Sequence, residues 1–177
     1  MRNEADAEAI RRLMEAIGRE ARGTGTVYLV GGATAVLHGW RSQTIDVDLK
    51  LDPEPAGIFG ALRRLKDELA INIELAAPDQ FLPPLPGWQE RSPHIGTFGR
   101  VRFCHYDFYS QALAKIERGH SQDAIDVHHM LSDALVEPGE LRRLFAVIEP
   151  ELERYPAVDA DELRRKLDAA LPRAVAE

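Results

Sequence analysis

The segment that most constrains the fold is LVGGATAVLHGWRSQTIDVDLKL, residues 29–51, in which the spacing of apolar side chains changes twice. The apolar, β-branched run at residues 26–30 predicts a short strand that stops at Gly31 and Gly32. Residues 33–38 then predict a short helix. A strand, a glycine turn and a helix in immediate succession indicate a domain that mixes helices and strands.

A second strand is predicted where apolar and polar residues alternate. One face carries Ile45, Val47, Leu49 and Leu51, and the other carries Thr44, Asp46, Asp48 and Lys50. Asp46 and Asp48 leave the same face, roughly 7 Å apart by the rise of a strand. Two carboxylates there repel each other unless a cation lies between them, and oxygen-only ligands suit Mg²⁺, which also coordinates substrate phosphates. The alternative is a solvated face of a half-exposed sheet.

The glycine pair adds a second signal of phosphate chemistry. Glycines between a strand and a helix let backbone N–H groups approach an anion beside the positive end of a helix dipole. A tight turn that merely needs positive φ is the alternative for Gly31 and Gly32. A phosphate cradle and metal-binding carboxylates on successive strands would face one site.

The rest of the chain predicts more strands first and helices later. Helices are expected at residues 5–21 and 58–70, strands at 71–76 and 97–105, and a Pro- and Gly-rich functional loop at 78–93. Four helices follow: one capped by Asp107 and ending near 117, one capped by Ser121 over 122–131, one from 139 to about 155, and one capped by Asp159.

Glu74 is the third candidate carboxylate. It lies on the polar face of the strand that follows the aspartate strand after one helix. Three carboxylates can hold two divalent ions for in-line displacement at phosphorus. An exposed glutamate on a strand is also common, so both explanations stay open.

The helical part contains AKIERGHSQDAIDVHHML, in which Lys115 or Arg118 can bind triphosphate oxygens and Asp126 can orient one of them. The alternative is a salt-bridged helix pair packed through apolar side chains, namely Ala112, Ile116, Ile125 and Leu131. His120, His128 and His129 with Asp123 match no standard zinc signature.

Length, charge and cysteine content restrict the number of domains, the class of partner and the cellular compartment. The chain has 177 residues, enough for one domain with a small appended subdomain, and its net charge of −7 argues against a surface built mainly to grip polyanions. Cys104 is the only cysteine, expected in the core, so no internal disulfide forms and a reducing compartment is expected. The charged N-terminus resembles no signal peptide and no membrane span is expected, which predicts a cytoplasmic protein.

The order of strand, GG pair, short helix and DxD strand resembles the nucleotidyltransferase superfamily, the fold of DNA polymerase β-like transferases. More closely, VGGATAVLHGWRSQTIDVDL with ALAKIERGHSQDAIDVHHML is similar to bacterial AbiEii-type toxins and proteins of the DUF6036 kind, over residues 26–131. Those proteins carry an HG-R-T-D-D segment and a later K-R-D-D segment.

The resemblance implies that Asp46 and Asp48 bind Mg²⁺ or Mn²⁺, that the turn holds the triphosphate, and that Lys115 and Asp126 belong to the active-site rim. Further candidates for nucleotide contact are Arg41, Thr44, Lys50 and Arg118. Two positions depart from the usual pattern, because Ala33 replaces a frequent Ser and Glu74 a more frequent Asp. Either departure can mean altered nucleotide choice or reduced activity.

We therefore expect an α+β fold, with a small mixed nucleotidyltransferase sheet flanked by helices in residues 1–106 and a helical C-terminal subdomain in 107–177, forming one compact unit. The expected enzyme is an Mg-dependent nucleotidyltransferase with catalytic residues Asp46, Asp48, Glu74 and Lys115. It would move a nucleoside monophosphate from an NTP to a hydroxyl acceptor on tRNA, protein or a small molecule, releasing pyrophosphate. By resemblance, it would act in a toxin–antitoxin or defence system with a cognate partner.

Two other functions fit parts of the pattern. A degenerate module of the same fold would bind a nucleotide or a partner without catalysis. A phosphatase or phosphomutase would use Asp46 as nucleophile, but its usual D-x-D-x-T/V run would put Thr or Val where this chain has Lys50.

Overall fold

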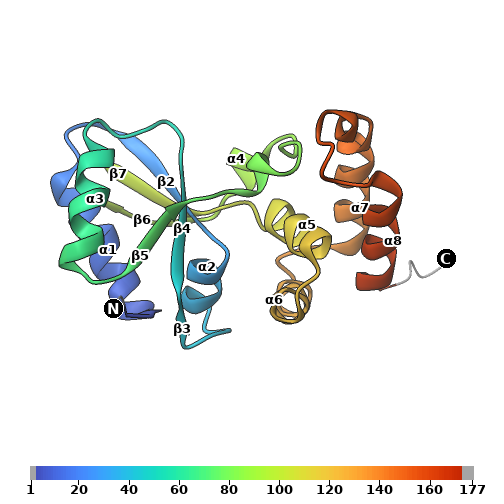
Figure 1. Ribbon diagram of the computed structural model, residues 1–177, viewed down its shortest axis with the longest axis horizontal. Coiled ribbons are helices and arrows are strands. Elements are labelled where there is room, and N and C mark those ends of the chain that lie inside the picture. Colours follow the sequence, from blue (N-terminus) through green and yellow to red (C-terminus); the bar gives the residue numbers. More distant parts are fainter. Residues whose placement is uncertain (1–2, 173–177) are drawn as a thin grey trace. The chain divides into compact units, whose positions relative to one another are not determined.

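The computed structural model describes residues 3–172, so the ends of both predicted domains, residues 1–2 and 173–177, lie outside the described part. The chain divides into two compact units, which we describe separately. The first holds residues 1–77 and 92–106, and the second holds residues 78–91 and 107–177. The fold is α+β, as expected: a mixed sheet with flanking helices, followed by a run of helices (Figure 1).

The first unit is built on five strands in the order β5-β4-β2-β7-β6, with a separate two-stranded pair β1-β3. The central strand β2 runs antiparallel to β4 and parallel to β7, so the sheet is mixed. The strands are β1 (Ala5–Asp6), β2 (Gly25–Val30), β3 (Gln43–Thr44), β4 (Asp46–Leu51), β5 (Asn72–Leu75), β6 (His94–Phe98) and β7 (Val101–His105). The helices are α1 (Ala7–Glu20), α2 (Gly32–Leu37) and α3 (Ile58–Glu68).

Helices α1 and α3 lie beside each other over one face of the sheet (Figure 1). Val47 and Leu49 of β4 are buried in the same core as Ile10 and Leu13 of α1. Because side chains alternate along a strand, Asp46 and Asp48 leave the opposite face. Burial of the apolar stripe thus fixes the register that presents both aspartates together.

Two strand predictions need correction. The single strand expected at residues 97–105 is the hairpin β6–β7, whose strands are joined at Gly99 and Arg100, with Gly99 at φ 57°. Ile45 does not share the buried face of β4, because it lies in a bend between β3 and β4 and is 67 % exposed.

The second unit is helical. Its elements are the 3₁₀ turns η1 (Pro78–Gln80) and η2 (Glu149–Arg154) and the helices α4 (Trp88–Arg91), α5 (Phe108–Arg118), α6 (Ser121–Ser132), α7 (Pro138–Ile148) and α8 (Ala160–Ala170). The segment expected as an irregular loop at 78–93 therefore contains η1 and α4. The helix expected to reach residue 155 ends at Ile148 and continues as η2.

Helix caps follow the predictions at Asp107 and Asp159 but not at Ser121. His120 is the N-cap of α6, and its backbone N–H donates to the carboxylate of Asp123 at the third helical position. Ile125 was expected in the packing of this helix, but it is exposed, whereas Val127 and Met130 are buried.

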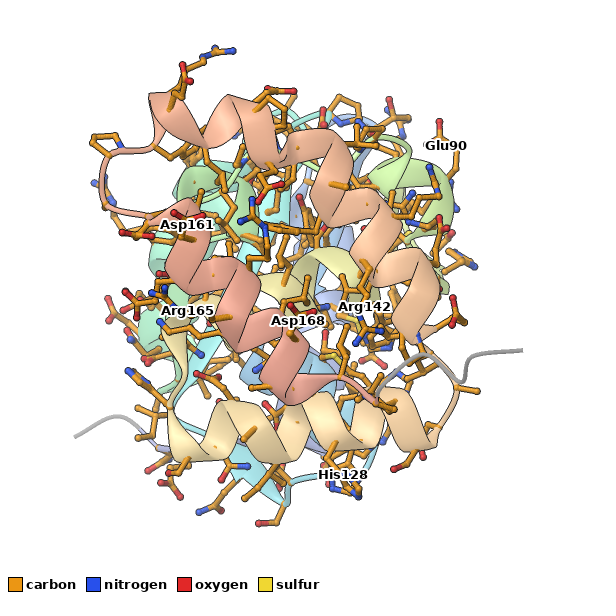
Figure 2. The ribbon with its side chains drawn as sticks, turned by 90° about the vertical axis from the view of Figure 1, so that its right-hand side faces the viewer. Glu90, His128, Arg142, Asp161, Arg165 and Asp168 are labelled. Atoms are coloured by element: carbon orange, nitrogen blue, oxygen red, sulfur yellow. The ribbon has the colours of Figure 1, made fainter. Side chains whose placement is uncertain are left out.

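Arg142 of α7 forms an ion pair with α8 and a hydrogen bond with the segment that follows α8. Nε of Arg142 lies 3.6 Å from Oδ1 of Asp168, and Nη2 of Arg142 donates to the carbonyl of Pro172 at 3.0 Å. Figure 2 shows the Arg142 and Asp168 side chains close together between the two helices. Within residues 3–172, no helix is long and apolar enough to cross a membrane.

Candidate functional site

The Gly31–Gly32 turn lies directly against the aspartate strand. Gly31 has φ 60° and ψ −122°, a conformation that favours glycine, and a Cβ built on it would lie 3.2 Å from Oδ2 of Asp48. A Cβ on Gly32 would lie 2.0 Å from Oγ1 of Thr44. The structure thus brings together four residues selected from the sequence: two glycines, Thr44 and Asp48.

Strand pairing explains this proximity. Val30, the last residue of β2, is opposite Asp48 in β4, so the turn that follows β2 begins beside that carboxylate. The hydroxyl of Thr44 donates to the carbonyl of Asp46 at 3.1 Å, which fixes its side chain beside Gly32. Both aspartates and Thr44 are partly buried.

Glu74 lies beside the aspartate strand, as expected. β4 and β5 are parallel neighbours, with Asp48 opposite Glu74 and Asp46 opposite Asn72. The side chain of Glu74 is exposed. The three carboxylates therefore share one face of two adjacent strands.

Asn72 connects two of these carboxylates and was given no role from the sequence. Its Nδ2 donates to Oδ1 of Asp46 and, at 3.0 Å, to Oε1 of Glu74. The period-two spacing that selected Glu74 also places Asn72 on the polar face, so this spacing was the signal available in the sequence.

The carboxylates of Asp46 and Asp48 suit a metal ion that is bound partly by the protein and partly by the phosphates of its substrate. Among residues 3–172, no group of three or more His, Cys, Asp or Glu side chains forms a metal-binding cluster on its own. Mg²⁺ is usually held by one or two protein carboxylates together with substrate phosphates and waters. Asp46 and Asp48, next to a glycine turn, fit that mode of binding.

Arg41 and Lys50 flank the aspartates on the chain. Lys50 lies two residues beyond Asp48 on the same strand, opposite Tyr28 of β2, and it is partly buried. Arg41, also partly buried, lies between α2 and β3. Both belong to the first unit with the carboxylates.

Lys115, Arg118 and Asp126 belong to the second unit, where they form their own charged cluster with Asp123. Nζ of Lys115 donates to Oδ2 of Asp126 at 2.6 Å, and both side chains are buried. Arg118 donates through Nε and Nη2 to the two oxygens of Asp123, at 2.8 and 2.6 Å. The salt-bridged helix pair considered from the sequence is therefore present between α5 and α6.

Burial and two neighbouring cations act in opposite directions on the pKa of Asp123. Burial raises the pKa of Asp123, but hydrogen bonds from Arg118 and the charges of Lys115 and Arg118 lower it more, so the pKa lies below its usual range. Asp123 is therefore a permanent anion at neutral pH, shared by both cations.

A second unpredicted group is a hydrogen-bond chain that links β2, α2 and β7. The hydroxyl of Thr34 donates to the carbonyl of Leu29 at 3.1 Å and lies 3.2 Å from Nδ1 of His105. A hydroxyl has one hydrogen, so His105 must donate through Nδ1–H. Burial, with a smaller contribution from His38, lowers the pKa of His105 to about 3, so the ring is neutral.

The histidines of α6 and Cys104, which was expected in the core, were also considered from the sequence. The histidines of α6 belong to no metal-binding cluster in the described chain. Cys104 is a buried core residue of β7, and burial raises the pKa of its thiol, which keeps it protonated and unreactive.

Comparison with known proteins identifies a family to which the chain is similar. A family model described as a nucleotidyltransferase of unknown function, DUF6036, matches residues 8–165, which contain the glycine turn, all three carboxylates and the Lys115 cluster. No curated protein and no solved structure gives a match. Because the family model covers most of the chain, the protein belongs to the DUF6036 family of nucleotidyltransferases.

Proposed function

We propose that the protein is an Mg²⁺-dependent transferase that moves a nucleoside monophosphate from an NTP to a hydroxyl acceptor. The observation that carries the proposal is the close approach of the Gly31 backbone to Asp48, the carboxylate opposite Glu74, where a Cβ on Gly31 would lie 3.2 Å from Oδ2 of Asp48. Nucleotidyl transfer needs a place for the triphosphate next to a place for its metal ion.

In this proposal, Asp46 and Asp48 hold Mg²⁺, or Mn²⁺ in its place, and the bound ion neutralises charge on the triphosphate. Backbone N–H groups of the glycine turn, where a side chain at Gly32 would meet Thr44, approach the phosphate oxygens. Arg41 and Lys50 are proposed as further phosphate contacts.

The reaction itself is an in-line displacement. The acceptor oxygen attacks the α-phosphorus, the bond from this phosphorus to the bridging oxygen of pyrophosphate breaks, and pyrophosphate leaves with the bonding electrons. Glu74, the most exposed of the three carboxylates, accepts the proton of the acceptor hydroxyl or serves as the third metal ligand. Positioning and electrostatics supply most of the catalysis in such a site.

Three residues of the helical unit belong to the proposal: Lys115 and Asp126, which the resemblance assigns to the active-site rim, and Arg118, a candidate for nucleotide contact. Arg118 has a side chain that is 56 % exposed, which suits contact with a phosphate oxygen. Lys115 and Asp126 are buried and paired with each other, so any effect on catalysis passes through that pair.

Pyrophosphate release tests the reaction. Each of the four NTPs is incubated with Mg²⁺ and a cell lysate, free pyrophosphate is measured, and modified products are identified by mass spectrometry. We expect release with one preferred NTP and its loss in Asp48→Asn, while the variant stays folded because removal of one charge relieves repulsion with Asp46. Full activity of Asp48→Asn would contradict the metal site.

The same experiment addresses a non-catalytic module of this fold. Mg-NTP binding without pyrophosphate release on any acceptor would support that module over the enzyme. Absence of Mg²⁺-dependent NTP binding would contradict the enzyme and a nucleotide-binding module, and would leave only a module that binds a partner.

We also propose a role as a toxin or defence component with a cognate partner, supported by the similarity to AbiEii-type toxins. Controlled expression in a bacterial host tests it: growth arrest with the wild type and normal growth with Asp48→Asn are expected. Equal growth of both strains at equal protein levels would contradict a toxic activity of the transferase site.

A further inference from the structure

We propose that Asn72 is a positioning residue of the nucleotidyl-transfer site, which orients the carboxylates of Asp46 and Glu74 across two strands. The inference rests on the proposed function and adds to it a neutral group that contacts two of the proposed metal ligands. The experiments below separate failure of this inference from failure of the function.

Contacts of the side-chain amide carry the argument. One nitrogen, Nδ2, donates to Oδ1 of Asp46 and to Oε1 of Glu74, and these two bonds use both of its hydrogens. Ionised carboxylates only accept hydrogen bonds, so the nitrogen of the amide, and not its oxygen, must face them. Each carboxylate is therefore held through one oxygen, and its second oxygen remains for another partner.

Core packing on either side holds the backbone of Asn72 in place. Ile71 and Ile73 on either side are buried in the core of the sheet unit, and Asn72 is opposite Asp46 in the parallel pair of β4 and β5. A one-residue slip of β5 would expose both isoleucines, so packing holds the amide on the carboxylate face.

Charge explains why an amide suits this position. Asp46, Asp48 and Glu74 already place three negative charges on one face, and a neutral donor screens two of them without adding a fourth. Groups that hydrogen-bond to metal ligands typically change metal affinity or activity by 10- to 100-fold when they are removed. The same range is expected here.

Two variants of Asn72 test the inference in opposite directions. Binding of Mn²⁺ to the full-length protein is titrated by electron paramagnetic resonance, with and without a non-hydrolysable NTP analogue, and kcat and the KM for NTP are measured separately. We expect Asn72→Ala to weaken Mn²⁺ binding about ten-fold and to lower kcat with little change in KM. Asn72→Asp, of nearly the same shape, is expected to bind Mn²⁺ more tightly without nucleotide and to lose kcat.

Asn3→Ala is the matched control. Asn3 is the chain's other asparagine, and it is exposed. Its backbone forms an isolated β-bridge with Ile71, the residue before Asn72, and its N–H donates to the carbonyl of Ala70. We expect wild-type metal binding and kinetics for this variant. Thermal unfolding of the metal-free proteins checks the fold, and if Asn72→Ala does not fold, the result for Asn72→Asp decides.

Comparison with Asp48→Asn distinguishes failure of the proposed function from failure of the role of Asn72. If the wild type binds no Mn²⁺ with the NTP analogue, the proposed function fails. If the wild type binds and Asp48→Asn does not, but Asn72→Ala matches the wild type in Mn²⁺ affinity and kcat, only the role of Asn72 is overturned.

Discussion

Gly31 and Gly32 are adjacent, yet they require glycine for different physical reasons. Gly31 needs it for its backbone, since φ 60° with ψ −122° is strained for any residue with a side chain. Gly32 needs it for space, because the Cβ of any other residue would overlap Oγ1 of Thr44. The close approach of backbone to Thr44 and Asp48 depends on both.

Gly32→Ala should destabilise the protein by about 1–3 kcal/mol, because Thr44 and the start of α2 must move apart. Addition of Thr44→Ala should recover part of this loss. Gly60→Ala is the control, since its Cβ would lie 3.7 Å from the nearest atom, in an exposed part of α3, and should stabilise by about 0.5–1 kcal/mol. Chemical denaturation measures all three; equal stabilities for Gly32→Ala and the wild type would contradict the steric argument.

His105 makes stability depend on pH. The unfolded chain takes up a proton on this ring near pH 6.5, whereas the folded protein does so only near pH 3. Between these values the unfolded state binds more protons, so the free energy of unfolding falls as the pH falls, by up to about 1.4 kcal/mol per pH unit. His105→Gln should show a smaller loss between pH 6.5 and 4.5, and an unchanged slope would contradict the neutral, buried state of this ring.

At the scale of elements, apolar periodicity predicted α1, β2, α2, β4 and α3, because each buries one continuous face against the same core. The β6–β7 hairpin was missed because only two residues, Gly99 and Arg100, separate its strands, and a single glycine within an apolar segment was not interpreted as a reversal in direction. Ile45 was misplaced because an alternating pattern does not show where a bend interrupts pairing.

Asp107 shows how much a cap can depend on tertiary contacts. It accepts hydrogen bonds from the N–H groups of Tyr109 and Ser110 and pairs in bidentate fashion with Arg91, while fully buried. Asp107→Ala should therefore cost about 3 kcal/mol or more. Asp159→Ala, at the exposed cap of α8, should cost about 1 kcal/mol. Equal losses in urea denaturation would mean that the Arg91 pair contributes nothing.

The buried pair of Lys115 and Asp126 allows its structural and catalytic roles to be separated. Lys115→Ala removes the cation that is paired with the buried carboxylate of Asp126 and should cost about 3–5 kcal/mol. Lys115→Met with Asp126→Leu replaces the pair by apolar groups and should fold with nearly wild-type stability, but lose pyrophosphate release. Wild-type release by this double variant would restrict the pair to a structural role.

At the scale of the whole molecule, the sequence identified most of the polar face of the sheet unit. The glycine turn, Thr44, both aspartates and Glu74 come together because the apolar pattern fixes the face of each strand and β4 pairs with both β2 and β5. Asn72 and the Thr34–His105 chain were missed because their importance lies in partners that are distant in sequence. Strand period shows which face a residue occupies but not what it contacts across the sheet.

The central claim is that the Gly31–Gly32 turn and Asp48 form one site for an NTP and its metal ion. Isothermal titration of a non-hydrolysable NTP analogue, with and without Mg²⁺, tests this most directly in the wild type and in Asp48→Asn. The account predicts binding by the wild type that requires Mg²⁺ and is lost in Asp48→Asn, with both proteins equally folded. Equal affinity with and without Mg²⁺, or wild-type affinity in Asp48→Asn, would contradict it.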